Sequence, residues 1–138
     1  MLLGFGIKDL IDVLLVALML FYLYKFMKES GVPVICCGEP MQELVPGTSD
    51  GAAEKHVPVV NVEGSKVTVT IGEVEHPMLE THYIEWIVLE TKKGAQEAYL
   101  QPGEKPVAEF MLADGDEAVA AYEYCNIHGL WKRDISSK

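Results

Sequence analysis

The sequence predicts a mainly β protein, in which a seven-stranded β-sandwich of the immunoglobulin-like type follows one N-terminal α-helix. Three observations support this prediction. Residues 13–24 form an uninterrupted apolar run, short β-branched runs fill the chain after Val57, and clusters of turn-forming residues separate these runs. Regularly spaced short strands are typical of a sandwich, whereas a long apolar run near a terminus is typical of a membrane helix.

The first segment, residues 1–30, is predicted to be a helix that anchors the chain in a membrane. Asp9 and Asp12 precede its apolar run and Lys25 and Lys28 follow it. A bilayer core needs about 20 apolar residues, so the segment spans only if these charged ends reach the interface. A secretory signal is disfavoured because acidic residues precede the apolar run and no small-residue cleavage site follows it. An amphipathic partner helix and a buried helix remain alternatives.

The stretch FGIKDLIDVLLVALMLFYLYKFMKESG resembles the first transmembrane helix of membrane-bound diadenylate cyclases. This resemblance implies an anchor and brings no cyclase activity with it. Lysines lie on both sides of the apolar run, so they favour a cytoplasmic position of the following domain only slightly. Free cysteines favour the same compartment. Ser30, Gly31 and Pro33 are expected to end the helix.

Residues 31–50 are predicted to be a linker, and residues 51–138 a single β domain. Its expected strands lie in VPVVNV, KVTVTIG, YIEWIVLET, EAYL, PVAEFML and EAVAAYEY. Glu63-Gly64-Ser65 indicates a hairpin between the first two strands, and later turns are expected at Lys93-Gly94, Pro102-Gly103 and Asp114-Gly115. EAVAAYEY could form a short helix because Glu and Ala favour helices, but the turns that bracket it favour a strand.

The charge and the cysteine count narrow the class of protein. A formal net charge of -10 and a pI near 4.7 argue against a nucleic-acid partner, because a phosphate backbone is bound by clustered Lys and Arg. The three cysteines are an odd count, and two of them, Cys36 and Cys37, are adjacent. This arrangement is unsuited to a disulfide framework and indicates free thiols, one of which, Cys125, is a candidate metal ligand.

The four histidines of the chain all lie in polar or turn-like contexts, namely EKHVP, EHPM, THY and CNIHG. Each one alone is more often a surface or core residue than a ligand. Cys125 and His128, however, have the Cys-x-x-His spacing that lets a thiolate and an imidazole reach one metal. Loops cluster at the ends of a sandwich, so the other histidines can join them. Five protein ligands overfill a tetrahedral zinc site but leave one position open on an octahedral iron.

The stretches EKHVPVV, EHPMLETHYIEWIVLE, PGEKPVAEFML and AYEYCNIHGLWK resemble the neelaredoxin module of superoxide reductases, the catalytic half of desulfoferrodoxin. The resemblance covers about residues 34–134 and implies reduction of superoxide to hydrogen peroxide. It also implies one iron ion (Fe2+/Fe3+) per chain. The implied ligands are four equatorial imidazoles and one axial sulfur, from His56, His76, His82, His128 and Cys125.

The same resemblance makes Glu54 and Lys55 the mobile pair beside the vacant position of the iron. Lys55 would attract the superoxide anion on an otherwise acidic protein and orient water. Glu54 would cap the oxidised site, since a carboxylate oxygen is a hard ligand suited to ferric iron. The family further implies an electron donor such as rubredoxin and the possibility of a homo-oligomer.

VICCGEPMQEL resembles the end of a desulforedoxin module, of which only the adjacent pair Cys36 and Cys37 remains. A tetrahedral thiolate iron needs four cysteines, so no second centre forms within one chain, although two chains could share one.

Two other functions compete with the reductase. A cupredoxin-like electron carrier would leave two histidines unexplained, and an inert zinc module would be colourless.

Overall fold

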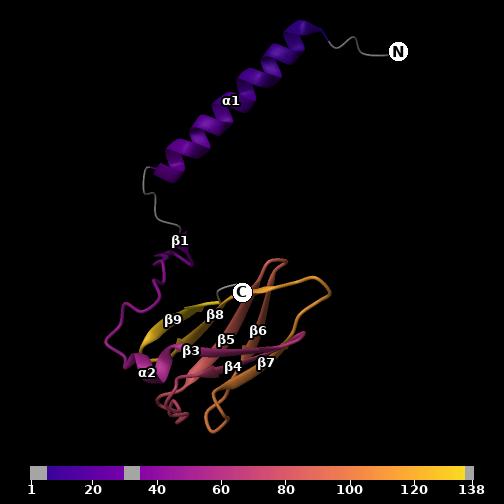
Figure 1. Ribbon diagram of the computed structural model, residues 1–138. Helices are drawn as coiled ribbons and strands as arrows, with labels where there is room; N and C mark the ends of the chain where they lie inside the picture. The colour runs from indigo at the N-terminus through magenta and orange to yellow at the C-terminus, as the bar shows by residue number, and fades with distance from the viewer. Residues whose placement is uncertain (1–5, 30–34, 136–138) are drawn as a thin grey trace. The chain divides into compact units, whose positions relative to one another are not determined.

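The computed structural model describes residues 6–29 and 35–135, and its first element is the predicted N-terminal helix (Figure 1). Helix α1 comprises Ile7–Glu29, and the Gly6 N–H donates a hydrogen bond to the Asp9 carboxylate (2.8 Å) at its first turn. Large apolar side chains are exposed along the helix from Ile7 to Phe26. Within the described ranges, no helix has the length and apolar character that a membrane crossing requires. The predicted helix-ending residues 30, 31 and 33 lie outside the described residues.

A small hairpin, formed by β1 (Ile35–Cys36) and β2 (Glu39–Pro40), follows. Its turn residues Cys37 and Gly38 both have positive φ angles, +54° and +88°, which is the geometry of a tight two-residue hairpin. Internal contacts divide the chain into two compact units, Met1–Glu43 and Leu44–Lys138. The finer division into residues 1–30, 31–50 and 51–138 stays a prediction.

The second unit consists of two antiparallel sheets and one short helix, α2 (Ala53–His56). One sheet has the strand order β3-β4-β7 and the other β6-β5-β8-β9. Their strands are β3 Pro58–Glu63, β4 Lys66–Ile71, β5 Ile84–Thr91, β6 Ala95–Tyr99, β7 Val107–Met111, β8 Ala118–Cys125 and β9 Gly129–Asp134. The predicted mainly β fold with sandwich-like sheets and an N-terminal helix is confirmed (Figure 1).

The core lies between the two sheets because alternate residues of the strands are apolar. Val67, Val69 and Ile71 of β4 are fully buried, as are Ile87 and Leu89 of β5. Each such side chain contributes about 1.5–3 kcal/mol when it is removed from water. The core therefore holds the strand ends, and the loops between them, in fixed positions.

The sequence interpretation of EAVAAYEY as a strand is confirmed, because these residues lie in β8. Strand β9 was not among the expected strands, since its sequence GLWKRD begins with glycine and ends in charged residues. It forms nonetheless because β8 offers a free edge, and Cys125 pairs with Gly129 at the hairpin end. Helix α2 was also missed, being only four residues long.

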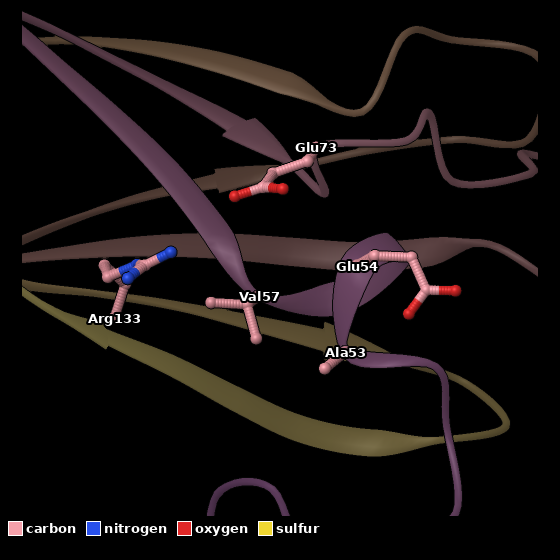
Figure 2. A pocket seen from close by; sticks show the side chains of 5 residues that line it. All are labelled: Ala53, Glu54, Val57, Glu73 and Arg133. Atoms are coloured by element: carbon pink, nitrogen blue, oxygen red, sulfur yellow. The ribbon is translucent and has the colours of Figure 1, made fainter.

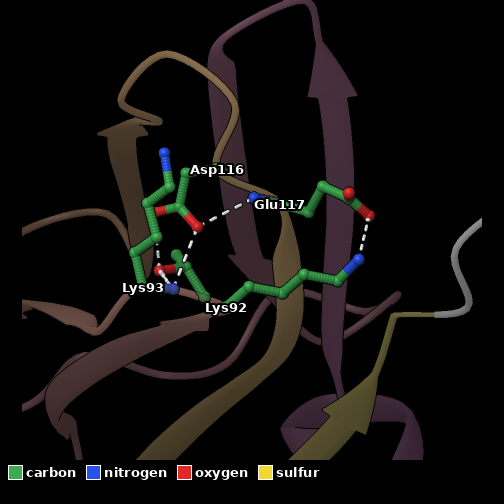
Figure 3. A network of polar contacts seen from close by, with 5 residues as sticks. Lys92, Lys93, Asp116 and Glu117 are labelled. Atoms are coloured by element: carbon green, nitrogen blue, oxygen red, sulfur yellow. Dashed lines mark hydrogen bonds and ion pairs between the residues drawn. The ribbon is translucent and has the colours of Figure 1, made fainter.

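A polar network fixes the end of β5 that carries Thr91 (Figure 3). Asp116 accepts hydrogen bonds from the Thr91 hydroxyl (2.7 Å) and from the Lys93 N–H (3.1 Å). Lys92 and Glu117 form an ion pair at 2.8 Å beside it. These contacts join the β5–β6 turn to the start of β8. The predicted site residues gather at the opposite end of β5.

Candidate metal centre

Four histidines and one cysteine converge where the loops at one end of the sandwich meet. His56 ends α2, and Cys125 ends β8. His76 and His82 lie in the connection between β4 and β5, and His128 lies in the turn that leads into β9. One ligand atom from each of the five residues lies within 4.8 Å of all the others. The structure thus brings together all five predicted ligands.

The four imidazole rings are arranged as a square. Neighbouring ring centroids lie 4.6–4.9 Å apart around the cycle, with nearly perpendicular planes, in the order His56, His76, His82, His128. His56 and His82 lie across the square at 6.5 Å and are nearly parallel. The Cys125 sulfur joins this set, 3.7 Å from His128 Nδ1. Four nitrogens and one sulfur around one point can hold a single metal ion.

Backbone carbonyls orient two of the rings. His56 Nδ1 donates to the Ala52 carbonyl (2.8 Å) and His76 Nδ1 donates to the Pro77 carbonyl (2.6 Å). A carbonyl only accepts, so both protons lie on Nδ1 and both Nε2 atoms carry lone pairs directed inward. Such outer hydrogen bonds are the usual way in which metal-binding histidines are fixed.

Two of the inward nitrogens, those of His76 and His82, have no hydrogen-bond donor among the described residues. His56 Nε2 and His76 Nε2 lie 3.2 Å apart, although both carry lone pairs. His82 Nε2 is buried and has no hydrogen-bond partner among the described residues. On a metal with bonds of about 2.1 Å, two nitrogens at right angles lie about 3.0 Å apart. The observed spacing and the unpaired nitrogens therefore fit a bound metal ion.

The surrounding residues hold the two chain segments of the centre together. Asn126 accepts a hydrogen bond from the Tyr83 N–H (3.0 Å) and donates one to the Thr81 carbonyl (3.2 Å), which links the Cys125 turn to the loop of His82. On the other side, a Cβ at Gly51 would lie only 3.0 Å from the His128 side chain. Gly51 therefore lets its loop pack directly on this ring.

Burial disfavours the charged forms of three of the imidazoles and of the thiol. It lowers the pKa of His76 to about 4 and also lowers the pKa of His56 and of His82. Burial raises the pKa of the Cys125 thiol. Neutral imidazoles are the form that binds metals, whereas the thiol must lose its proton on binding. Metal uptake should therefore release a proton from Cys125.

Glu54 and Lys55, the predicted catalytic pair, are exposed on α2 next to His56. Besides burial and His128, the charge of Lys55 contributes to the lowered pKa of His82, so the lysine acts electrostatically on the centre. Glu54 lines a pocket of about 460 Å³ together with Glu73 and Arg133, and its carboxylate points away from Arg133 (Figure 2). The roles of Glu54 and Lys55 stay predictions.

Glu123 is a buried residue near the centre that the sequence interpretation missed. It is fully buried, and neither carboxylate oxygen has a hydrogen-bond partner among the described residues. Burial raises its pKa to about 9. The feature of the sequence that could have identified Glu123 is its position two residues before Cys125 in a strand, because residues two apart in a strand lie on the same face.

This fold and site define a class of protein, a β-sandwich metalloprotein with one centre of four imidazoles and one thiolate. A family model described as Desulfoferrodoxin matches residues 48–134, and another, described as CdaA N-terminal transmembrane domain, matches residues 1–39. The chain belongs to the desulfoferrodoxin family.

Individual relatives agree with this assignment. The chain is 48% identical to a desulfoferrodoxin of Nitratidesulfovibrio vulgaris over 105 residues, which cover 76% of this chain and 82% of the relative. It is 34% identical to a superoxide reductase of Pyrococcus horikoshii, over 64% of this chain and 91% of the relative. The superoxide reductase structure from Treponema pallidum has a TM-score of 0.70 at 43% identity and covers 75% of this chain and 86% of its own.

Proposed function

We propose that this chain is a superoxide reductase, which transfers one electron to superoxide and yields hydrogen peroxide. The observation that carries the proposal is the square of four imidazoles with the Cys125 thiol beside it. Relatives named superoxide reductase support it. The substrate is therefore the superoxide anion.

The proposed cofactor is one iron ion (Fe2+/Fe3+) per chain. Its ligands are His56, His76, His82, Cys125 and His128. Iron accepts five protein ligands and keeps a sixth position, whereas structural zinc is usually satisfied by four. When bound, the iron supplies the electron and an open position for the substrate. The thiolate donates electron density to it.

Lys55 and Glu54 are the proposed catalytic residues beside the open position. Lys55 attracts superoxide locally, which matters on a chain of net charge -10. Its ammonium also holds the water that protonates the product. Glu54, which precedes Lys55 on α2, would supply a carboxylate to the open side of the oxidised centre.

Each turnover consumes one electron, so a donor protein such as rubredoxin re-reduces the centre. We further infer that α1 attaches the chain to a membrane, with the catalytic domain in the cytoplasm. The match of residues 1–39 to a transmembrane domain and the exposed apolar side chains of α1 support this attachment. A homo-oligomer is compatible with membrane attachment.

We also propose that the sandwich is of the immunoglobulin-like type. The arrangement of three strands in one sheet and four in the other supports this proposal.

Metal analysis and rapid mixing test this function. The protein is purified anaerobically, its metal content is measured, and the reduced form is mixed with superoxide while the visible spectrum is recorded. We expect one iron per chain, rapid growth of a thiolate-to-iron band, and release of hydrogen peroxide. Bound zinc or copper, or no reaction with superoxide, would contradict the proposal and favour an electron carrier or an inert metal module.

A further inference from the structure

The segment after β4 is bonded to the backbone of the helix that carries the proposed catalytic pair. The Val74 N–H donates to the Glu54 carbonyl (3.0 Å), and the Gly72 N–H donates to the Val57 carbonyl (3.3 Å). These two hydrogen bonds extend the pairing of β3 with β4 beyond the strands themselves. They attach α2 to the segment that follows β4.

Gly72 lies directly against the peptide group of Lys55. Its φ angle is +80°, and a Cβ there would lie 2.7 Å from the Lys55 carbonyl oxygen and 2.8 Å from its carbon. The Val74 carbonyl oxygen would be closer still, at 2.5 Å. All of these neighbours are backbone atoms, which cannot rotate away as a side chain can. Any side chain at position 72 must therefore displace Lys55, Val74 or both.

The neighbouring ligand His56 resists such a displacement better than Lys55 does. Its ring is buried, bonded to the Ala52 carbonyl, and stacked on Trp131 at a centroid distance of 5.0 Å. Lys55 is exposed, so it has no enclosing side chains to hold it in place. A push from position 72 should move the lysine more than the ligand.

We propose that Gly72, together with the Val74 N–H, positions Lys55 for the reaction with superoxide. Glycine is required at position 72 for two reasons. It adopts the left-handed backbone without strain, and it leaves room for the Lys55 peptide. Gly72 is a positioning residue, since it acts on superoxide only through Lys55. This inference rests on the proposed function of Lys55.

The matched substitutions Gly72→Ala and Gly64→Ala test the proposal in the full chain. Gly64 also has a positive φ angle, +63°, but open space surrounds its Cβ position. Both substitutions strain the backbone similarly, and only the first displaces Lys55. We expect Gly72→Ala to keep its iron and visible band, to exchange the Val74 amide proton faster, and to react with superoxide about tenfold to about a hundredfold more slowly. Gly64→Ala should react at the wild-type rate.

A double-substitution cycle separates positioning from a general structural effect. In a Lys55→Ala background, Gly72→Ala should cause no further loss of rate, because the residue through which it acts is gone. An equal loss in both backgrounds, an unchanged rate, or loss of iron from Gly72→Ala would overturn the proposal. If Gly72→Ala does not fold, Val74→Pro is the second variant: it removes the N–H that donates to the Glu54 carbonyl, and it should slow the reaction in the wild-type background but not in the Lys55→Ala background. Failure of the wild-type protein to react would instead refute the proposed function.

Discussion

At the scale of single residues, Cys125 differs from the other two cysteines in its surroundings. Cys125 is buried beside four imidazoles, whereas Cys36 and Cys37 are exposed in the β1–β2 hairpin. A serine hydroxyl is a much poorer ligand for iron than a thiolate and does not lose its proton readily. The sulfur of Cys125 should therefore determine both the colour and the reactivity of the centre.

We expect Cys125→Ser to abolish the thiolate-to-iron band and the reaction with superoxide. The visible spectrum of the oxidised protein and rapid mixing of the reduced protein measure these two losses. Cys36→Ser is the matched control and should retain both properties. Normal turnover by the Cys125→Ser protein would contradict the assigned ligand.

Lys55→Ala should slow the reaction with superoxide by about tenfold or more while the iron content stays the same, because local attraction of the anion and water placement are lost. Stopped-flow traces at several ionic strengths measure this effect, and the difference between the proteins should shrink as salt screens the charge. Lys66→Ala serves as the control, since Lys66 is paired with Glu109 on the surface of the sandwich. Equal effects of the two substitutions would refute a specific role for Lys55.

Glu123 should make the protein less stable as the pH rises. Its pKa is about 9 in the folded chain against an ordinary value of 4.5, so between these values the folded state holds a proton that the unfolded state has lost. Stability then falls with pH, by up to about 1.4 kcal/mol per pH unit. The comparison with a variant that lacks this carboxyl isolates the effect, because the histidines, with an ordinary pKa of 6.5, and the Cys125 thiol also titrate in this range but do so in both proteins.

Glu123→Gln should remove this slope. Denaturant unfolding of both proteins at pH 6.5, 7.5 and 8.5 measures it, and the glutamine variant should lose less stability across the series. Parallel slopes would show that the Glu123 carboxyl is not protonated in the folded protein.

At the scale of elements, the centre depends on the alignment of two connections, the turn between β8 and β9 and the loop between β4 and β5. The Asn126 side chain bridges them through Tyr83 and Thr81. Loss of an outer contact of this kind typically lowers metal affinity by about tenfold to about a hundredfold.

Asn126→Ala should therefore lower the affinity for iron by a factor in that range without unfolding the sandwich. Competition with a chelator measures the affinity, and circular dichroism checks the fold. Asn61→Ala is the control, because the exposed Asn61 side chain donates a hydrogen bond to Glu63 on β3, away from the centre. An unchanged affinity in Asn126→Ala would show that strand pairing alone aligns the two connections.

At the scale of the whole molecule, the chain joins a helix with exposed apolar side chains to a metal-binding sandwich. If α1 attaches to a membrane, charged residues in its middle should oppose attachment by about 2.5 to 3.5 kcal/mol each. The double substitution Leu15→Glu and Leu18→Glu should therefore abolish flotation of the full chain with phospholipid vesicles. Met111→Glu, which changes an exposed residue of β7, should not. Flotation of the doubly substituted chain would refute attachment through α1.

The sequence by itself determined the helix, most of the strands and the identity of the five candidate ligands. The long apolar run predicts a helix, the short β-branched runs predict strands, and His and Cys are the residue types that bind such metals. The strand β9 could not be predicted, because its formation depends on the free edge of β8 rather than on its own residues.

Only the tertiary structure decided how distant residues meet. His56 and His128 lie 72 positions apart, yet their ring nitrogens approach to 3.0 Å. Their distance depends on the packing of two sheets and on the register of β8 with β9, which no local pattern encodes. The burial of Glu123 and the contact of Gly72 with Lys55 have the same origin. Local sequence thus selects the elements and the chemistry, whereas the packing of those elements sets the geometry of the site.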